Sequence, residues 1–160
     1  MNGLKLLIVG VLLVGLVGRS EGADKHELES LRGIESFDVV VECLDTESQE
    51  HGITVEKIKT AVELRIKRTG IRVGDKEESY LYVQVTTLWD EAGFFCAAVY
   101  VGFNQKVVLK KNKISNFVTT WKTAYLLKGP TKTASSQIFE SINDRIDEFL
   151  NDYLAANPKD

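Results

Sequence analysis

Hydrophobic and polar positions repeat with two different periods along the chain, and these periods predict its elements. Residues 37–44 (FDVVVECL) are rich in β-branched residues and predict a strand. Over residues 55–68 apolar side chains recur every three or four positions, which is typical of an amphipathic helix. Thr54 is placed to cap this helix and Gly70 to end it, before a short strand over residues 71–73. The first half therefore predicts a β-α-β unit with a parallel, right-handed crossover.

The middle of the chain changes to a period of two. Strands are predicted over residues 80–89, 94–109 and 114–127, joined by turns at 90–93 and 110–113. Short turns between alternating segments are typical of an antiparallel meander, so these three strands should pair in sequence order.

A second amphipathic helix should close the chain after a cap at Ser135 or Ser136. Its apolar stripe consists of Ile138, Ile142, Ile146, Phe149 and Tyr153. The polar segments 23–33 and 45–52 are expected to be weakly helical and a loop, respectively. The predicted fold class is α+β, a two-layer sandwich in which both helices cover one face of a mixed β-sheet.

The N-terminal segment predicts export. A basic start over residues 1–5 is followed by an uncharged apolar stretch over 6–18 and then by small and polar residues, as in a secretory signal peptide. A membrane-spanning helix needs roughly 20 apolar residues, so this stretch is short for an anchor, although an uncleaved N-terminal anchor is the alternative. We therefore expect a signal peptide over 1–22 and a single domain over 23–160, periplasmic or secreted, without an integral span after cleavage.

Composition and charge narrow the kinds of partner. The chain has 160 residues, is 44% hydrophobic and 27% charged, and carries a formal charge of −3, which becomes −4 without residues 1–22. Residues 92–139 contain seven lysines and no Asp or Glu. These lysines either protect strand edges from aggregation or form a surface that faces an anion. Nucleic acid is not expected as a partner of an acidic exported protein, whereas phospholipid, a cell-wall polymer or an acidic protein patch is.

Motifs for catalysis, cofactors and metals are not found. The sequence has no G-x-S-x-G elbow, phosphate loop or dinucleotide-binding glycine pattern, so no catalytic or cofactor-binding residue is predicted. His26 and His51 have no ligand partners at zinc spacing and are expected to be solvated. Glu42 is the best-placed carboxylate for acid–base chemistry, but strand alternation predicts that it points to solvent.

Cys43 and Cys96 leave two alternatives open. Export favours a disulfide between them. Strand parity argues against it, because Cys43 is in phase with Val39 and Val41, whereas Cys96 is out of phase with its buried neighbours. The alternative is two separate thiols, each buried or half-buried.

Four segments carry a resemblance to known proteins: ESFDVVVECL, GITVEKIKTAVELRIKRTGIRV, YLYVQVTTL and IDEFLNDYLAANPK. Together they resemble a family of small uncharacterised exported bacterial proteins. The order of elements is also similar, at the level of the fold, to the N-terminal domain of the periplasmic protein TolB and to outer-membrane lipoprotein activators of cell-wall synthases. The resemblance implies a partner-binding module rather than an enzyme, although the lipid-attachment cysteine of the activators has no counterpart here.

If both helices cover one face of the sheet, the other face stays open, as antiparallel sheets allow. Alternation places tyrosines beside polar and cationic groups there: Tyr82, Gln84, Thr86, Tyr100, Asn104, Lys106 and Lys122. Such a composition suits a recognition surface, since tyrosine buries much area at little entropic cost. The predicted function is a non-catalytic envelope or secreted interaction module that contacts a protein or anionic component. A small-ligand carrier and an unrecognised hydrolase are the alternatives.

Overall fold

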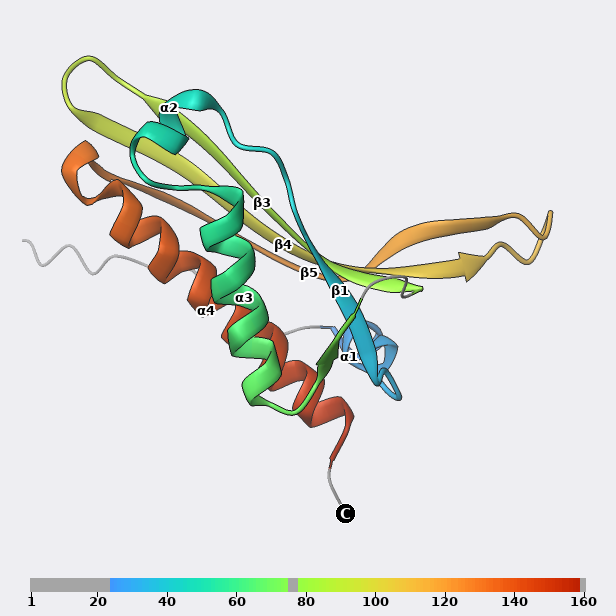
Figure 1. Cartoon of the computed structure of the whole chain (residues 1–160). Helices are drawn as coiled ribbons and strands as arrows, with labels where there is room; N and C mark the ends of the chain where they lie inside the picture. The colour runs from blue at the N-terminus through green and yellow to red at the C-terminus, as the bar shows by residue number, and fades with distance from the viewer. Residues whose placement is uncertain (1–23, 75–77, 159–160) are drawn as a thin grey trace, which may run out of the picture.

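The computed structural model describes residues 24–74 and 78–158, so the predicted signal peptide lies outside the described residues. One five-stranded sheet consists of β1 (Ser36–Val41), β2 (Arg72–Val73), β3 (Ser79–Trp89), β4 (Phe94–Val108) and β5 (Ser115–Pro130), in the order β2-β1-β3-β4-β5. The long helices α3 (Val55–Arg68) and α4 (Ala134–Ala156) lie on a single face of this sheet (Figure 1). β1 pairs in parallel with β2 and β3, whereas β3, β4 and β5 pair antiparallel. The α+β prediction, with a mixed sheet and one helical layer, is confirmed.

The first unit follows the predicted order β1 (Ser36–Val41), α3 (Val55–Arg68) and β2 (Arg72–Val73). The Thr54 side chain caps α3 by accepting a hydrogen bond from the Lys57 N–H at 3.3 Å. After the helix, Gly70 adopts a φ of 88°, a left-handed conformation that favours glycine, and the chain turns back into the sheet.

Two short helices were underestimated from the sequence. α1 (Lys25–Ser30) begins with a capping box. The Asp24 side chain accepts a hydrogen bond from the His26 N–H at 2.8 Å, and the Glu27 side chain accepts one from the Asp24 N–H at 3.2 Å. The segment predicted as a polar loop contains α2 (Thr46–Glu50), so that prediction is wrong. A single helical turn has little stability of its own, and α2 depends on contacts with β3 that local pattern does not show.

The meander consists of β3 (Ser79–Trp89), β4 (Phe94–Val108) and β5 (Ser115–Pro130). The turn between β3 and β4 forms as predicted, with the Asp90 carboxylate accepting from the Phe94 N–H at 2.8 Å. Between β4 and β5 the register shifts by one residue after Phe103, which leaves Thr120 as an extra residue in β5. Such a bulge bends and twists the strands.

The last helix, α4 (Ala134–Ala156), starts slightly earlier than predicted, after the 3₁₀ turn η1 (Thr131–Thr133). Neither Ser135 nor Ser136 is its N-cap. Thr133 holds that position without a side-chain capping bond, and the Ser136 hydroxyl donates back to the Thr133 carbonyl at 2.9 Å.

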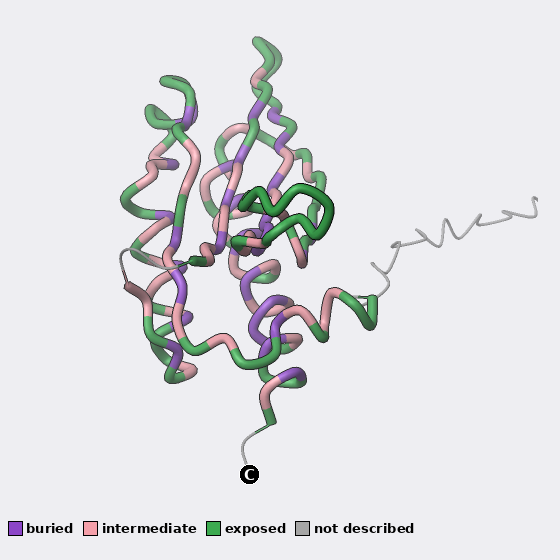
Figure 2. The backbone as a smooth tube through the Cα atoms, turned by 90° about the vertical axis from the view of Figure 1, so that its right-hand side faces the viewer, coloured by how far each residue is buried: buried purple, intermediate pink, exposed green. Residues whose placement is uncertain are grey.

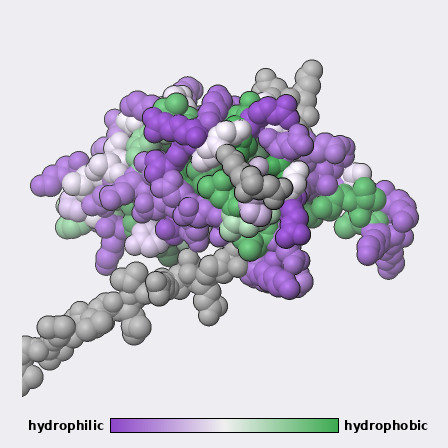
Figure 3. Space-filling view, turned by 90° about the horizontal axis from the view of Figure 1, so that it is seen from below, coloured by the Kyte–Doolittle hydropathy of each residue, from purple (hydrophilic) through white to green (hydrophobic). Residues whose placement is uncertain are grey.

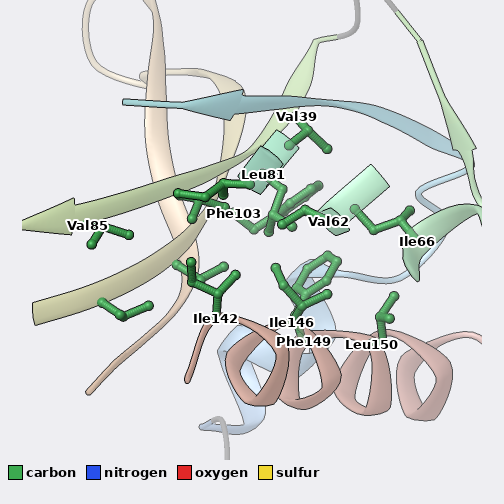
Figure 4. Packing of buried hydrophobic residues seen from close by; sticks show 14 of the residues in the cluster. Val39, Val62, Ile66, Leu81, Val85, Phe103, Ile142, Ile146, Phe149 and Leu150 are labelled. Carbon is green, nitrogen blue, oxygen red and sulfur yellow. The ribbon is translucent and has the colours of Figure 1, made fainter. Parts of the chain in front are cut away.

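The core lies between the two long helices and the sheet (Figure 4). Phe149 of α4 packs edge-on against Phe37 of β1 and stacks on Phe103 of β4, with ring centroids 5.6 and 5.4 Å apart. The apolar stripes predicted from helical spacing are buried here, apart from the half-buried Val55: Ile58, Val62, Ile66, Ile138, Ile142, Ile146 and Phe149. The prediction of one shared core is confirmed.

Candidate interaction surface

We call the sheet face opposite the two long helices the open face. It is formed by alternate residues of β1, β3, β4 and β5. The register places Tyr82 opposite Gly102, Gln84 opposite Tyr100 and Gly102 opposite Lys122. The side chains predicted from alternation therefore share one face: Tyr82, Gln84, Thr86, Tyr100, Asn104, Lys106 and Lys122. Their role in binding stays a prediction.

Tyrosine rings cover the middle of this face. The Tyr82 and Tyr100 rings meet edge to face, with their centroids 6.4 Å apart. The Tyr100 ring also lies over Gly102, where an added Cβ would come within 2.6 Å of the Tyr100 hydroxyl oxygen. The absent side chain of Gly102 thus makes room for the ring, and Gly102 itself is buried beneath it. This part of the face is aromatic, and both of its tyrosines are half-buried.

Glu42 is the residue whose setting departs most from prediction. It is half-buried rather than directed into solvent, and its Oε2 atom is buried with no hydrogen-bond partner among the described residues. Burial, together with a hydrogen bond to the Glu42 carboxylate, raises the pKa of Tyr82 to about 12. The prediction of a solvated Glu42 failed because the neighbouring strand brings Tyr82 against it.

The polar residues at one end of the open face are largely engaged within the protein. The Lys106 ammonium lies 2.8 Å from the Glu78 carboxylate, and this pairing lowers the pKa of Glu78. The Asn104 side-chain oxygen accepts a hydrogen bond from the Thr119 hydroxyl at 2.8 Å. Lys106 and Lys122 are both exposed, and Lys122 lies nearer the tyrosines, opposite Gly102. Lys106 is paired with Glu78, whereas Lys122 has no ion pair within the described ranges, so Lys122 is the better placed of the two lysines to meet a partner.

The opposite end of the open face is apolar, and this was missed in the sequence. Leu88, Phe94 and Leu126 keep 72%, 54% and 79% of their surface exposed. Register places Leu88 opposite Cys96, and Ala98 opposite Leu126. These five residues form what we call the apolar end, and a hollow of about 390 Å³ opens over most of them, bordered by Thr86 and Lys128. The predicted open face did not include Leu88 or Leu126, and it is the register between β3, β4 and β5 that brings them together.

A polar cluster, in which Ser48 and Thr87 are buried, connects α2 to β3. Asp45 accepts hydrogen bonds from the Ser48 N–H at 2.7 Å, the Ser48 hydroxyl at 2.8 Å and the Thr87 hydroxyl at 2.9 Å. Burial acts to raise the pKa of Asp45, but these three donors outweigh it and lower the pKa. The Trp89 indole N–H donates to the Thr87 hydroxyl at 3.1 Å.

Serine, aspartate and histidine thus occur close together around α2, but not in the geometry of a catalytic triad. His51 stacks on the Trp89 ring, with centroids 4.2 Å apart, and has no hydrogen bond to Ser48 or Asp45 in the described part of the chain. Ser48 is fully buried and its hydroxyl is engaged by Asp45 and Thr87. The cluster therefore caps α2 and holds it against the sheet.

Cys43 and Cys96 are both free and exposed, so they form no disulfide in the structure. The alternative prediction of buried or half-buried thiols is also wrong. β1 ends at Val41, so Cys43 lies beyond the paired part of the strand, and Cys96 projects from the open face within the apolar end. Over the described ranges, no cluster of His, Cys, Asp and Glu has a metal-binding arrangement. None of the described helices has the length and apolar character needed to cross a membrane.

The chain has weak similarities to solved structures, among them two bacterial proteins. No protein-family model and no curated protein matches the sequence. A minor lipoprotein from Acinetobacter baumannii is 11% identical with a TM-score of 0.34, over 77% of this chain and 93% of that one. Lipoprotein GNA1162 from Neisseria meningitidis is 10% identical with a TM-score of 0.25, over 72% of this chain and 95% of that one.

Both similar structures are described as bacterial lipoproteins. Neither is described as a TolB domain or as an activator of a cell-wall synthase, so that finer resemblance stays a prediction. Similarities of this size assign no function to this chain.

Proposed function

We propose that the protein is an exported, non-catalytic interaction module that binds a protein of the cell envelope through the open face of its sheet. Localisation to the periplasm or the extracellular space is part of the proposal and rests on the signal-peptide pattern of residues 1–22. The observation that carries the binding role is the apolar end, where large exposed apolar side chains surround a hollow.

An exposed apolar patch bordered by polar residues is typical of a protein-binding surface. Leu88 and Leu126 would lose most of their contact with water under a partner, and Lys128 at the border would remain solvated, as in a standard interface. The tyrosines in the middle of the face extend the same surface. Tyr82 and Tyr100 are already held by ring contact and by Glu42, so little conformational entropy remains to be lost on binding.

The two alternative functions have less support. A small-ligand carrier would need an apolar cavity between helices and sheet. That space is occupied by side chains with no exposed surface, such as Phe37, Phe103 and Phe149. A hydrolase would need a nucleophile and a base in hydrogen-bond contact, and Ser48 and His51 do not have that arrangement.

The experiment compares partner capture by two double variants after crosslinking in the envelope fraction. Leu88→Ser with Leu126→Ser removes the two most exposed leucines of the apolar end. Leu64→Ser with Leu154→Ser is the matched control, because these leucines are 51% and 40% exposed on α3 and α4, in the other layer. Both variants should melt as the wild type does, since all four side chains lie outside the core.

We expect the control to retain the proteins that the wild type captures and the open-face variant to lose at least one of them. Capture of the same proteins in the same amounts by all three chains would contradict the proposal. Loss of captured proteins from the control alone would contradict the proposal and would place the binding surface on the helical layer.

A further inference from the structure

β4 and β5 continue beyond the rest of the sheet as a two-stranded hairpin over residues 106–117, which we call the hairpin arm. β3 accompanies β4 only as far as Ser79 opposite Gln105, whereas β4 and β5 stay paired up to Val108 opposite Ser115. Within the described ranges no third strand flanks this part. The arm projects away from both layers (Figure 1), and nearly all of it is exposed in the view along its length (Figure 2).

The base of the arm is held by specific contacts. The bulge at Thr120 changes the direction of β5 where the arm begins. The Gln105 side-chain amide donates to the Thr120 hydroxyl at 2.7 Å and to the Ser30 carbonyl of α1 at 2.9 Å. On the other side, the Lys106 N–H donates to the Glu78 carbonyl at 2.8 Å. The arm is thus an extension of a braced sheet rather than a loose loop.

The arm exposes large apolar side chains that its own fold cannot bury. Val108, Leu109, Ile114 and Phe117 keep 60%, 43%, 57% and 44% of their surface exposed. Single exposed apolar residues are ordinary, but four within one hairpin form a concentrated apolar surface. The Phe117 ring packs against Tyr80 of β3, with ring centroids 5.3 Å apart. A two-stranded ribbon has no interior of its own, so only another surface can cover the parts of these four side chains that stay exposed.

Three lysines surround the tip. Lys110, Lys111 and Lys113 are exposed, and no Asp or Glu occurs between residues 92 and 139. Lys113 has a φ of 60°, and its N–H donates to the Leu109 carbonyl at 2.9 Å. This hydrogen bond closes a tight turn whose three lysine side chains are exposed. At the right-hand side of Figure 3, a hydrophobic band lies on the arm and the tip beyond it is hydrophilic.

We propose that the hairpin arm docks on an anionic phospholipid surface, with the tip lysines at the headgroups and the apolar side chains in the interfacial region. Lysines near an anionic leaflet each contribute to attraction, and adjacent apolar groups add interfacial burial. Val108 and Phe117 lie on the open-face side by alternation, whereas Leu109 and Ile114 flank the turn. A lipid interface surrounds an inserted tip on all sides, whereas a protein partner would cover one side. This inference uses a different surface from the apolar end and does not depend on the proposed function.

The experiment measures co-sedimentation of the purified exported protein with vesicles of phosphatidylcholine alone or with roughly 40% phosphatidylglycerol, an anionic lipid. Lys110→Gln, Lys111→Gln and Lys113→Gln together remove the charge of the tip. The matched control is Lys25→Gln, Lys67→Gln and Lys132→Gln, which changes the net charge equally on exposed lysines outside both the arm and the open face. All the proteins carry the same N-terminus, so a difference between the variants comes from the substituted lysines. Leu109→Ser with Ile114→Ser tests the apolar contribution.

We expect binding to anionic but not to neutral vesicles, weakened by salt. The tip variant should bind anionic vesicles at least tenfold more weakly than the wild type, and the variant Leu109→Ser with Ile114→Ser several-fold more weakly. The affinity of the control should change less than threefold. As a second measurement, Leu109→Trp should add a blue-shifted tryptophan emission when anionic vesicles are present. No binding to anionic vesicles would overturn the inference. An equal loss in the tip variant and in the control would also overturn it, because attraction would then follow net charge rather than the arm.

Discussion

The Tyr153 hydroxyl donates a hydrogen bond to the Ile34 carbonyl, joining the end of α4 to a residue 119 positions earlier. Asn157 adds two further hydrogen bonds, and we call the three bonds together the latch. Its side-chain oxygen accepts from the Gly33 N–H at 2.7 Å, and its amide donates to the Leu31 carbonyl at 2.9 Å. Two residues of the closing segment IDEFLNDYLAANPK therefore fasten the last helix to the residues that precede β1.

The latch should contribute measurably to stability. Tyr153→Phe removes one hydrogen bond and should lower the free energy of unfolding by about 1 kcal/mol. Asn157→Ala leaves the Gly33 and Leu31 backbone groups without this partner and should cost about 1–3 kcal/mol. Urea unfolding measures both, with Asn151→Ala, on an exposed position of the same helix, as the control. Equal stability of Asn157→Ala and Asn151→Ala would show that the latch contributes nothing.

Core truncations test the packing of the two layers. Ile142 and Val62 have 0% and 1% of their surface exposed, so alanine at either position should cost about 2–4 kcal/mol. Leu154→Ala, at a position 40% exposed, should cost far less. The midpoints of urea unfolding give the stability differences, provided that the dependence of the unfolding free energy on urea concentration is the same in each variant. Losses below about half a kcal/mol at both buried positions would mean that the helices do not pack as described.

An ion pair between the helices should make stability depend on pH. The Arg65 guanidinium donates from Nε and Nη2 to both oxygens of Asp147, and this lowers the pKa of Asp147. Because the folded pKa lies below the unfolded value near 3.8, the stabilisation is present above about pH 4 and lost as the pH falls through the folded pKa. Both side chains are more than a third exposed, so Asp147→Asn should cost only about 0.5–1 kcal/mol at pH 7.

Chemical unfolding of wild type and Asp147→Asn between pH 7 and about pH 2 measures this dependence. The difference between the two proteins should shrink as Asp147 becomes protonated. Glu140→Gln, on an exposed position of α4, should show no comparable change. A difference that stays constant down to the lowest pH would assign the effect of the substitution to packing rather than to charge.

Export makes a separate prediction about the N-terminus. Cleavage after residue 22 or 23 would leave a chain that begins at Ala23 or Asp24. N-terminal sequencing of the protein recovered outside the cytoplasm should find one of these ends. An intact Met1 on that species would favour the anchored alternative.

Much of the fold could be predicted because its elements have strong periods of their own. The strands of the meander alternate over many residues, and the stripes of α3 and α4 continue for several turns, so local pattern and tertiary packing agree. α2 could not be predicted in this way. It is held by Asp45, Ser48 and Thr87, and Thr87 is 42 positions away from Asp45 in the sequence.

The candidate surface was predictable only in part for the same reason. Alternation assigns Tyr82, Tyr100 and Lys122 to the open face whatever their neighbours on adjacent strands are. The apolar end depends on which residues of three strands stand opposite one another, and the half-burial of Glu42 depends on the Tyr82 hydroxyl from the next strand. Register of this kind comes from turn geometry and the bulge, which single-residue patterns do not encode.

The two free cysteines allow a test of the central claim, that the open face binds a partner, even while that partner is unidentified. Cys96 lies in the apolar end, whereas Cys43 is exposed beyond the end of β1. The measurement is the ratio of their alkylation rates, determined by mass spectrometry on the protein in intact cells and after purification. We predict that Cys96 reacts several-fold more slowly relative to Cys43 in cells than in the purified protein, because a partner covers the apolar end. An identical ratio in both conditions would contradict the account.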